Sequence, residues 1–196
     1  MNYSYSEIRQ AVSACRERYP VLSAGSLPID MLSFLEFDLK LDIIPITGLR
    51  TRCGVDAALL PDGGGVYVDE VSYVGLDTNP PWLSRRLRFT LAHEYAHLVL
   101  HRDSPSALRR SSIGDYELSL CNLDREIERE ADEFAGQLLV PAEVLSAELA
   151  KRPLPNAIRT NPAARHYFAE QMAPRFGVIP LSVEIRLNRE GIWPLP

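Results

Sequence analysis

The stretch LAHEYAHLVLHR, residues 91–102, constrains this chain most strongly because it places ionisable side chains in an apolar helical pattern. His93, Glu94 and His97 lie among leucines, alanines and a valine. Burying such groups costs free energy unless each finds a partner. Residues i and i+4 project from the same face of a helix, so both imidazoles can reach one metal ion. The His-Glu-x-x-His spacing therefore predicts a zinc site, with Glu94 beside the ion as general base.

A chance occurrence of this spacing is improbable, because the 196-residue chain has only four histidines. His101 follows one turn after His97 and is tempting as a further ligand. Two helical turns, about 12 Å, separate it from His93, however, so one ion cannot take all three rings. We therefore interpret His101 as a structural residue.

A catalytic zinc site has three protein ligands and one open position, so a third ligand must come from another segment. Residues 122–141, NLDREIEREADEFAGQLLVP, have apolar residues at helical spacing and carry several acids. This periodicity favours Glu128 as the ligand over Glu130, and Asp124 near the expected N-cap is a further alternative. Asp132 lies one turn after Glu128, where it can accept the second N–H of a ligand histidine and orient the ring.

The two helices together resemble the ImmA/IrrE family of zinc metallopeptidases. The matching stretches are RRLRFTLAHEYAHLVLHR and EREADEFAGQLLVP, and the upstream LPIDMLSFLEFDLKLDIIPI and AALLPDGGGVYVDE also fit. The resemblance covers about residues 25–190 and implies a compact gluzincin-like fold with a small sheet beside the active-site helix. It also implies that His93, His97 and Glu128 hold a Zn²⁺ ion and that Glu94 is the general base.

Members of this family typically cleave helix-turn-helix transcriptional repressors, which implies a zinc-dependent endopeptidase that relieves repression in stress responses or mobile-element control. Glu94 would take a proton from water and pass it to the leaving amine. Tyr95, His166 and Tyr167 are candidate donors to the oxyanion. The strand VYVDE, residues 66–70, is expected to offer an edge for an extended peptide, with an ordinary hairpin strand as the alternative.

Local patterns predict an α+β chain. The resemblance implies a zincin-like metallopeptidase fold with a small sheet beside the two long helices. Helices are expected at 5–19, from about 28 to 39, from Ser84 as N-cap to 102, and at 122–140, 142–151, 161–173 and near the C-terminus. A short strand is expected at 43–46 and a hairpin around Pro61-Asp62-Gly63-Gly64-Gly65, with irregular chain at 72–83 and a polar loop at 103–121. We interpret the chain as one metallopeptidase domain, 1–196, with an N-terminal helix at 1–24, a core at about 25–150 and a C-terminal helical segment at 151–196.

Composition indicates the compartment and excludes some partners. The net charge of −5 argues against a general nucleic-acid binder. No apolar run approaches the roughly 18 residues that a membrane span needs, and no signal peptide is visible. Three scattered cysteines without a CxxC pair fit a reducing compartment. We therefore expect a cytoplasmic protein without a membrane anchor, whose partner is a protein substrate.

Two alternatives to a peptidase are a non-proteolytic zinc-binding protein and a DNA-binding regulatory module. The intact Glu94 argues against a zinc site that has lost its activity. The segment MAPRFGVIPLSVEIRL, residues 172–187, resembles a helix-turn-helix fragment with Phe176-Gly177-Val178 as the turn. Pro180 and the lack of a basic stripe disfavour DNA binding, so we expect this segment to dock against the catalytic core.

Overall fold

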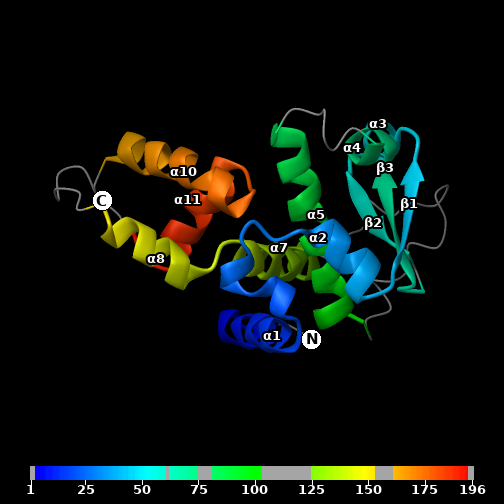
Figure 1. Cartoon of the computed structure of the whole chain (residues 1–196), viewed down its shortest axis with the longest axis horizontal. Helices are drawn as coiled ribbons and strands as arrows, with labels where there is room; N and C mark the ends of the chain where they lie inside the picture. The colour runs from blue at the N-terminus through cyan, green and yellow to red at the C-terminus, as the bar shows by residue number, and fades with distance from the viewer. Residues whose placement is uncertain (1–2, 61, 75–80, 103–124, 153–160, 194–196) are drawn as a thin grey trace.

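The computed structural model describes residues 3–60, 62–74, 81–102, 125–152 and 161–193. In chain order its elements are α1 (Tyr5–Arg18), η1 (Pro20–Leu22), η2 (Ala24–Ser26), α2 (Met31–Ser33), η3 (Phe34–Asp38), β1 (Asp42–Ile46), α3 (Leu49–Cys53), β2 (Ala57–Leu59), β3 (Gly65–Asp69), α4 (Glu70–Val74), α5 (Pro81–Leu100), α7 (Arg125–Leu139), α8 (Ala142–Ala150), α10 (Pro162–Phe176) and α11 (Pro180–Arg189). The predicted α+β class is confirmed, with the sheet on one side of α5 and α8, α10 and α11 on the other (Figure 1).

The first two predicted helices begin at polar caps. Ser4 and Glu7 form a capping box at the start of α1, in which the Ser4 N–H donates to Glu7 Oε2 at 2.7 Å. This helix ends before Pro20, as expected. Asp30 caps α2 by accepting a hydrogen bond from the Ser33 N–H at 3.1 Å. The predicted second helix differs in its later part, because α2 continues into the π-helical turn η3.

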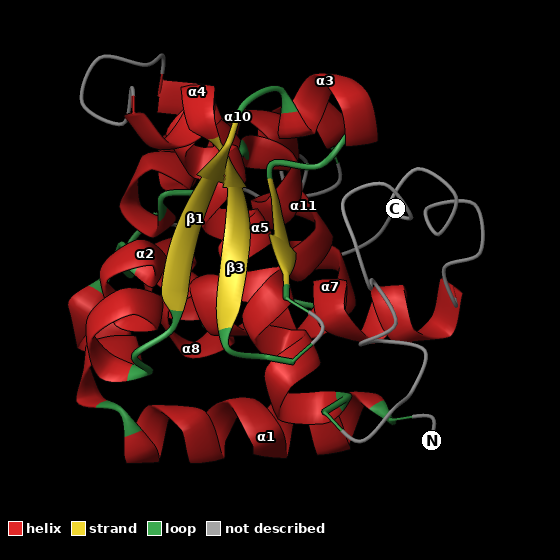
Figure 2. Cartoon of the chain, turned by 90° about the vertical axis from the view of Figure 1, so that its right-hand side faces the viewer, coloured by secondary structure: helices red, strands yellow, loops and turns green. Residues whose placement is uncertain are grey.

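The sheet has the strand order β1-β3-β2, with β3 parallel to β1 and antiparallel to β2 (Figure 2). The predicted hairpin between β2 and β3 is confirmed, although Pro61 of its turn lies outside the described residues. Of the two interpretations of residues 66–70, the free edge is wrong and the ordinary hairpin strand is confirmed, because β3 is the central strand and Glu70 already begins α4. The strand that contacts α5 is instead the edge strand β2.

Other boundaries differ from the local predictions. Ser84 is not an N-cap, because α5 already begins at Pro81, whose carbonyl accepts a hydrogen bond from Ser84 Oγ at 3.0 Å. Proline is tolerated there because the first N–H groups of a helix have no helical acceptor. The short helices α3 and α4 were not predicted, so residues 72–74 are helical rather than irregular. The predicted polar loop at 103–121 lies outside the described residues.

Helices α5 and α7 make the most extensive contact between any two described elements. Each of them buries two alanines one turn apart, Ala92 and Ala96 on α5 and Ala131 and Ala135 on α7. Small side chains let helix axes approach closely. This packing brings the acids of α7 alongside the histidines of α5.

The C-terminal helices α10 and α11 pack on this core, as the docking prediction expects. Helix α11 buries Val183 and Leu187 and contacts both α7 and α8. The turn between α10 and α11 contains Gly177, which has a left-handed φ of 62°. Within the described ranges, no helix is long and apolar enough to cross a membrane.

Replacing Gly177 with alanine is expected to destabilise the fold by about 2–4 kcal/mol. The left-handed conformation alone costs a residue with a Cβ about 1–2 kcal/mol. The new Cβ would overlap Arg88 Nη1 and would lie 2.8 Å from Pro28 Cβ. Arg88 has little freedom to move away, because it donates to the carbonyls of Ile29 at 2.9 Å and of Gly177 at 2.6 Å.

Gly191→Ala is the matched control for Gly177→Ala. Gly191 has a φ of 61°, but a Cβ added to it would meet no atom within 4 Å, so only the conformational cost applies. Urea denaturation measures both variants. Equal losses of stability in the two would show that the contact with Arg88 contributes nothing.

Candidate metal centre

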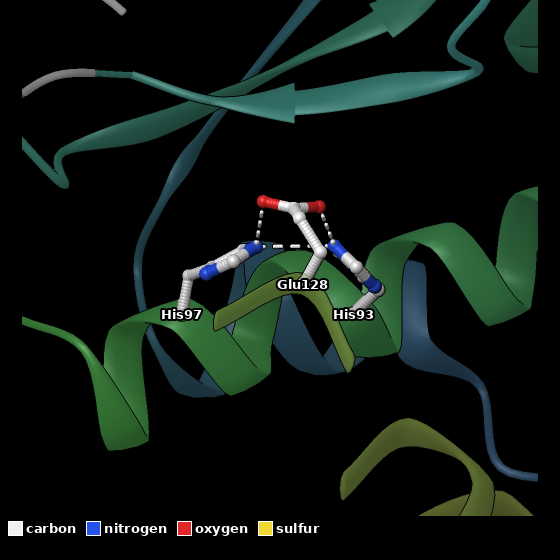
Figure 3. Close-up of side chains that lie close together, drawn as sticks. All are labelled: His93, His97 and Glu128. Atoms are coloured by element: carbon white, nitrogen blue, oxygen red, sulfur yellow. Dashed lines mark hydrogen bonds and ion pairs between the residues drawn. The ribbon is translucent and has the colours of Figure 1, made fainter. Parts of the chain in front are cut away.

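The structure brings His93, His97 and Glu128 together. One ligand atom from each lies within 4.8 Å of the other two. His93 Nε2 lies 3.0 Å from His97 Nε2, and the Glu128 carboxylate oxygens lie 3.1 Å and 3.6 Å from these two nitrogens. Figure 3 shows both rings on α5 pointing toward the carboxylate from α7, with strands of the sheet passing nearby.

These separations fit a single tetrahedral ion. Zinc binds nitrogen and carboxylate oxygen at about 2.0–2.1 Å, so its ligand atoms lie about 3.3–3.4 Å from one another. The observed distances of 3.0, 3.1 and 3.6 Å lie on both sides of that value. Two imidazoles and one carboxylate are also a donor set of catalytic zinc sites, which keep a fourth position open.

The surroundings of His93 favour a positive charge. Asp132 Oδ1 lies 2.9 Å from His93 Nδ1, on the far side of the ring from Glu128. Burial lowers the pKa of His93, but hydrogen bonds to Asp132 and Glu128 and the charge of Glu94 outweigh it and raise the pKa to about 10. Without a metal the ring is therefore protonated at neutral pH. A bound cation would replace that proton among the same three carboxylates.

Glu94 is buried beside the cluster. Its Oε2 accepts a hydrogen bond from the Leu59 N–H of β2 at 2.7 Å. A hollow of about 220 Å³ is lined by Glu94 together with His93, Glu128 and Asp132. Glu94 is thus one of the carboxylates that line this hollow.

Glu130, the alternative third ligand, contacts a different histidine. Its carboxylate lies 2.9 Å from His101 Nε2 and accepts a hydrogen bond from the Tyr3 N–H at 2.7 Å. His101 Nδ1 lies 3.1 Å from His97 Nδ1. Both contacts are hydrogen bonds if His97 Nδ1–H donates to His101 Nδ1 and His101 Nε2–H donates to Glu130. His97 Nε2 then carries no proton and can bind a metal. Asp124 lies outside the described residues.

His101 was predicted to be structural, and its contact with the ring of His97 is a role that the sequence analysis missed. The signal was the i, i+4 spacing of the two histidines. We expect His101→Ala to weaken zinc affinity about 10–100-fold, because His97 loses the acceptor that fixes its tautomer and orientation. Competition with a chromogenic chelator measures this affinity. His166→Ala, at an exposed histidine on α10, is the control, and equal affinities in the two variants would exclude the orienting role.

The structure does not bring the three candidate oxyanion donors to the hollow. The Tyr95 hydroxyl is buried and donates to Cys15 Sγ at 3.2 Å. His166 is exposed and lies 2.6 Å from Glu184, a hydrogen bond that raises the pKa of the ring. Tyr167 is exposed on the same helix. None of the three is among the described residues that line the hollow.

A cation that the sequence analysis missed does line the hollow. Arg86 Nε donates to Asp56 Oδ2 at 3.0 Å, and Arg86 Nη2 lies 2.9 Å from the same oxygen. Asp56 is buried just before β2. No local pattern could have paired these residues, because they lie 30 positions apart.

The comparison with protein families agrees with this geometry. A family model described as the IrrE N-terminal-like domain, peptidase M78, matches residues 83–188. The match spans more than half of the chain and includes α7 and all but the first two residues of α5, the helices that carry the cluster. A comparison with curated proteins finds no match. The resemblance inferred from the two helices is confirmed, and the chain belongs to the ImmA/IrrE family, that of the IrrE N-terminal-like domain.

Proposed function

We propose that this protein is a zinc-dependent endopeptidase that cleaves a helix-turn-helix transcriptional repressor. The peptidase M78 match and the His93–His97–Glu128 cluster support a metallopeptidase. The observation that carries the proposal is that Glu94 lines the same hollow as His93 and Glu128. The choice of a repressor as substrate rests on the family resemblance alone.

The chemistry follows from the positions of the side chains. His93, His97 and Glu128 would hold the zinc, while Asp132 and His101 orient the two rings. Bound zinc supplies a Lewis acid that lowers the pKa of water and polarises the scissile carbonyl. Glu94 accepts a proton as the water oxygen bonds to the carbonyl carbon, and gives it to the amine as the C–N bond breaks.

The edge strand β2 is the proposed place for an extended substrate. Among the residues that the structure describes it pairs with β3 alone, and Ala57 lines the hollow. Leu59 on the same strand donates its N–H to Glu94. A peptide added to this edge would hold a backbone carbonyl near the cluster.

The proposed compartment is the cytoplasm, because a repressor acts where the DNA is. Cys15 and Cys53 are free and buried, which is consistent with a reducing compartment.

The test is incubation of the zinc-loaded protein with a helix-turn-helix repressor encoded beside its own gene. We expect one cut, located by mass spectrometry, that a chelator prevents and added zinc restores. A repressor left intact by the zinc-loaded protein, or a cut that persists in chelator, would reject the proposal. A generic substrate such as casein is unsuitable, because a protease with one target cleaves it poorly.

A further inference from the structure

A groove of about 470 Å³ lies beside the metal hollow, lined by residues of α5, α7 and α11. The groove and the hollow share Arg86, Phe89, Thr90 and Asp132, so they form one continuous cleft. Both α5 and α11 contact α7, and in Figure 1 α11 lies to the left of α5. A chain bound at the cluster could therefore continue into the groove.

Part of the groove is apolar and open to solvent. Phe89 on α5 lines one side, and Ile179, Leu181 and Ile185 line the other. Leu181 is 58% exposed and Ile185 is 44% exposed, at surface positions where polar side chains would be better solvated. Exposed aliphatic side chains that border a cleft are characteristic of binding surfaces.

The rest of the lining is basic. Its lining includes two acids, Asp132 and Glu133, and five arginines: Arg85, Arg86, Arg129, Arg186 and Arg189. Arg86 is already paired with Asp56 at 2.9 Å. Glu133 is already paired with Arg186 at 2.7 Å and Arg189 at 2.5 Å. Arg85 and Arg129 have no acidic partner in the part of the chain that the structure describes. This local excess of positive charge contrasts with the net charge of −5 and favours a negatively charged ligand.

We infer that this groove binds the substrate segment on one side of the scissile bond, and that this segment carries large apolar residues with acidic residues close by. The inference rests on the proposed function, because the groove opens into the metal hollow. A nucleic acid would satisfy the arginines but leave Leu181 and Ile185 without apolar partners. An acidic, apolar peptide satisfies both parts of the lining.

The test measures peptide binding without turnover. Zinc-loaded Glu94→Gln protein is titrated into three fluorescein-labelled twelve-residue peptides, and fluorescence anisotropy is recorded. The first has two central leucines followed by three acidic residues, the second has lysines for the acids, and the third has serines for the leucines. We expect the first peptide to bind at least about tenfold more tightly than either of the others.

Variants of the groove locate the binding. Arg85→Glu combined with Arg129→Glu should weaken binding of the acidic peptide at least about tenfold and strengthen binding of the lysine peptide. The control is Arg18→Glu with Arg102→Glu, the same charge change at a separate hollow. Ile185→Asp should weaken binding of the two peptides that contain leucines. Val74→Asp, at a residue 74% exposed on α4, should leave their binding unchanged. Zinc content and thermal midpoints confirm that each variant is folded.

Four results would overturn the inference: equal binding of acidic and lysine peptides, no response to the groove variants, no peptide binding, or tighter binding of a twenty-base-pair DNA duplex. Cleavage by the wild-type protein is measured separately. If cleavage is intact but the peptide preference is absent, only the groove assignment fails. If the preference is present but no zinc-dependent cut occurs with any peptide or repressor, the proposed function fails.

Discussion

Glu94→Gln is expected to lower zinc-dependent cleavage of the substrate about 10²–10⁴-fold while the protein keeps about one zinc per chain. Glutamine has the size of glutamate, and its amide oxygen can still accept the hydrogen bond from the Leu59 N–H. The amide cannot take a proton from the attacking water, so the chemical step fails although the fold and the cluster remain. The measurements are kcat/KM on the cleaved protein and zinc content by elemental analysis.

The matched control is Glu17→Gln, which makes the same change at an exposed position on α1 and should leave both quantities unchanged. Cleavage at the wild-type rate by Glu94→Gln would remove Glu94 from its proposed role. Loss of zinc along with activity would show instead that Glu94 binds the metal or stabilises the fold.

Glu128→Ala is expected to weaken zinc binding about 100-fold or more. Structural zinc sites bind with about 10–16 kcal/mol, so each ligand contributes on the order of 3 kcal/mol. The Glu128 carboxylate oxygens lie 3.1 Å and 3.6 Å from the ring nitrogens of His93 and His97. Without that carboxylate, only the two imidazoles of the cluster remain to bind the zinc. Activity should fall with the zinc content, and a high zinc concentration should restore part of it.

The comparison with Glu130→Ala tests the assignment of the third ligand. Glu130 contacts His101 rather than the cluster, so its loss should weaken zinc binding only about 10–100-fold. Glu126→Ala, at an exposed position on the same helix, should have no effect. If Glu130→Ala lost more zinc than Glu128→Ala, the third ligand would be Glu130.

The choice between these two acids shows how far helical periodicity could lead. Residues two apart point to opposite sides of a helix, and the apolar pattern of α7 favours Glu128 only by its position next to that face. In the structure both acids reach histidines of α5: Glu128 lies at the rings of His93 and His97, and Glu130 at His101 one turn further on. The spacing along α7 could not reveal this, because it depends on how the two helices cross.

The strands also show what local sequence patterns could and could not predict. The hairpin of β2 and β3 is local, and its glycine-rich turn predicted it correctly. The central position of β3 depends on β1, which pairs with it in parallel from an earlier part of the chain. A pattern of alternating residues does not tell which neighbours a strand will have, so the sequence left open whether residues 66–70 form an edge or an ordinary hairpin strand.

The sequence by itself determined the helix with its two imidazoles and glutamate, the family, and the α+β class. These features depend on residue spacing within single segments, and such spacing follows directly from helix and strand geometry. Only the tertiary structure decided which acid meets His93 and His97, which strand borders the hollow, and that a basic, apolar groove continues from it. Each of these depends on contacts between segments far apart in the chain, and the close packing of α5 against α7 sets their positions.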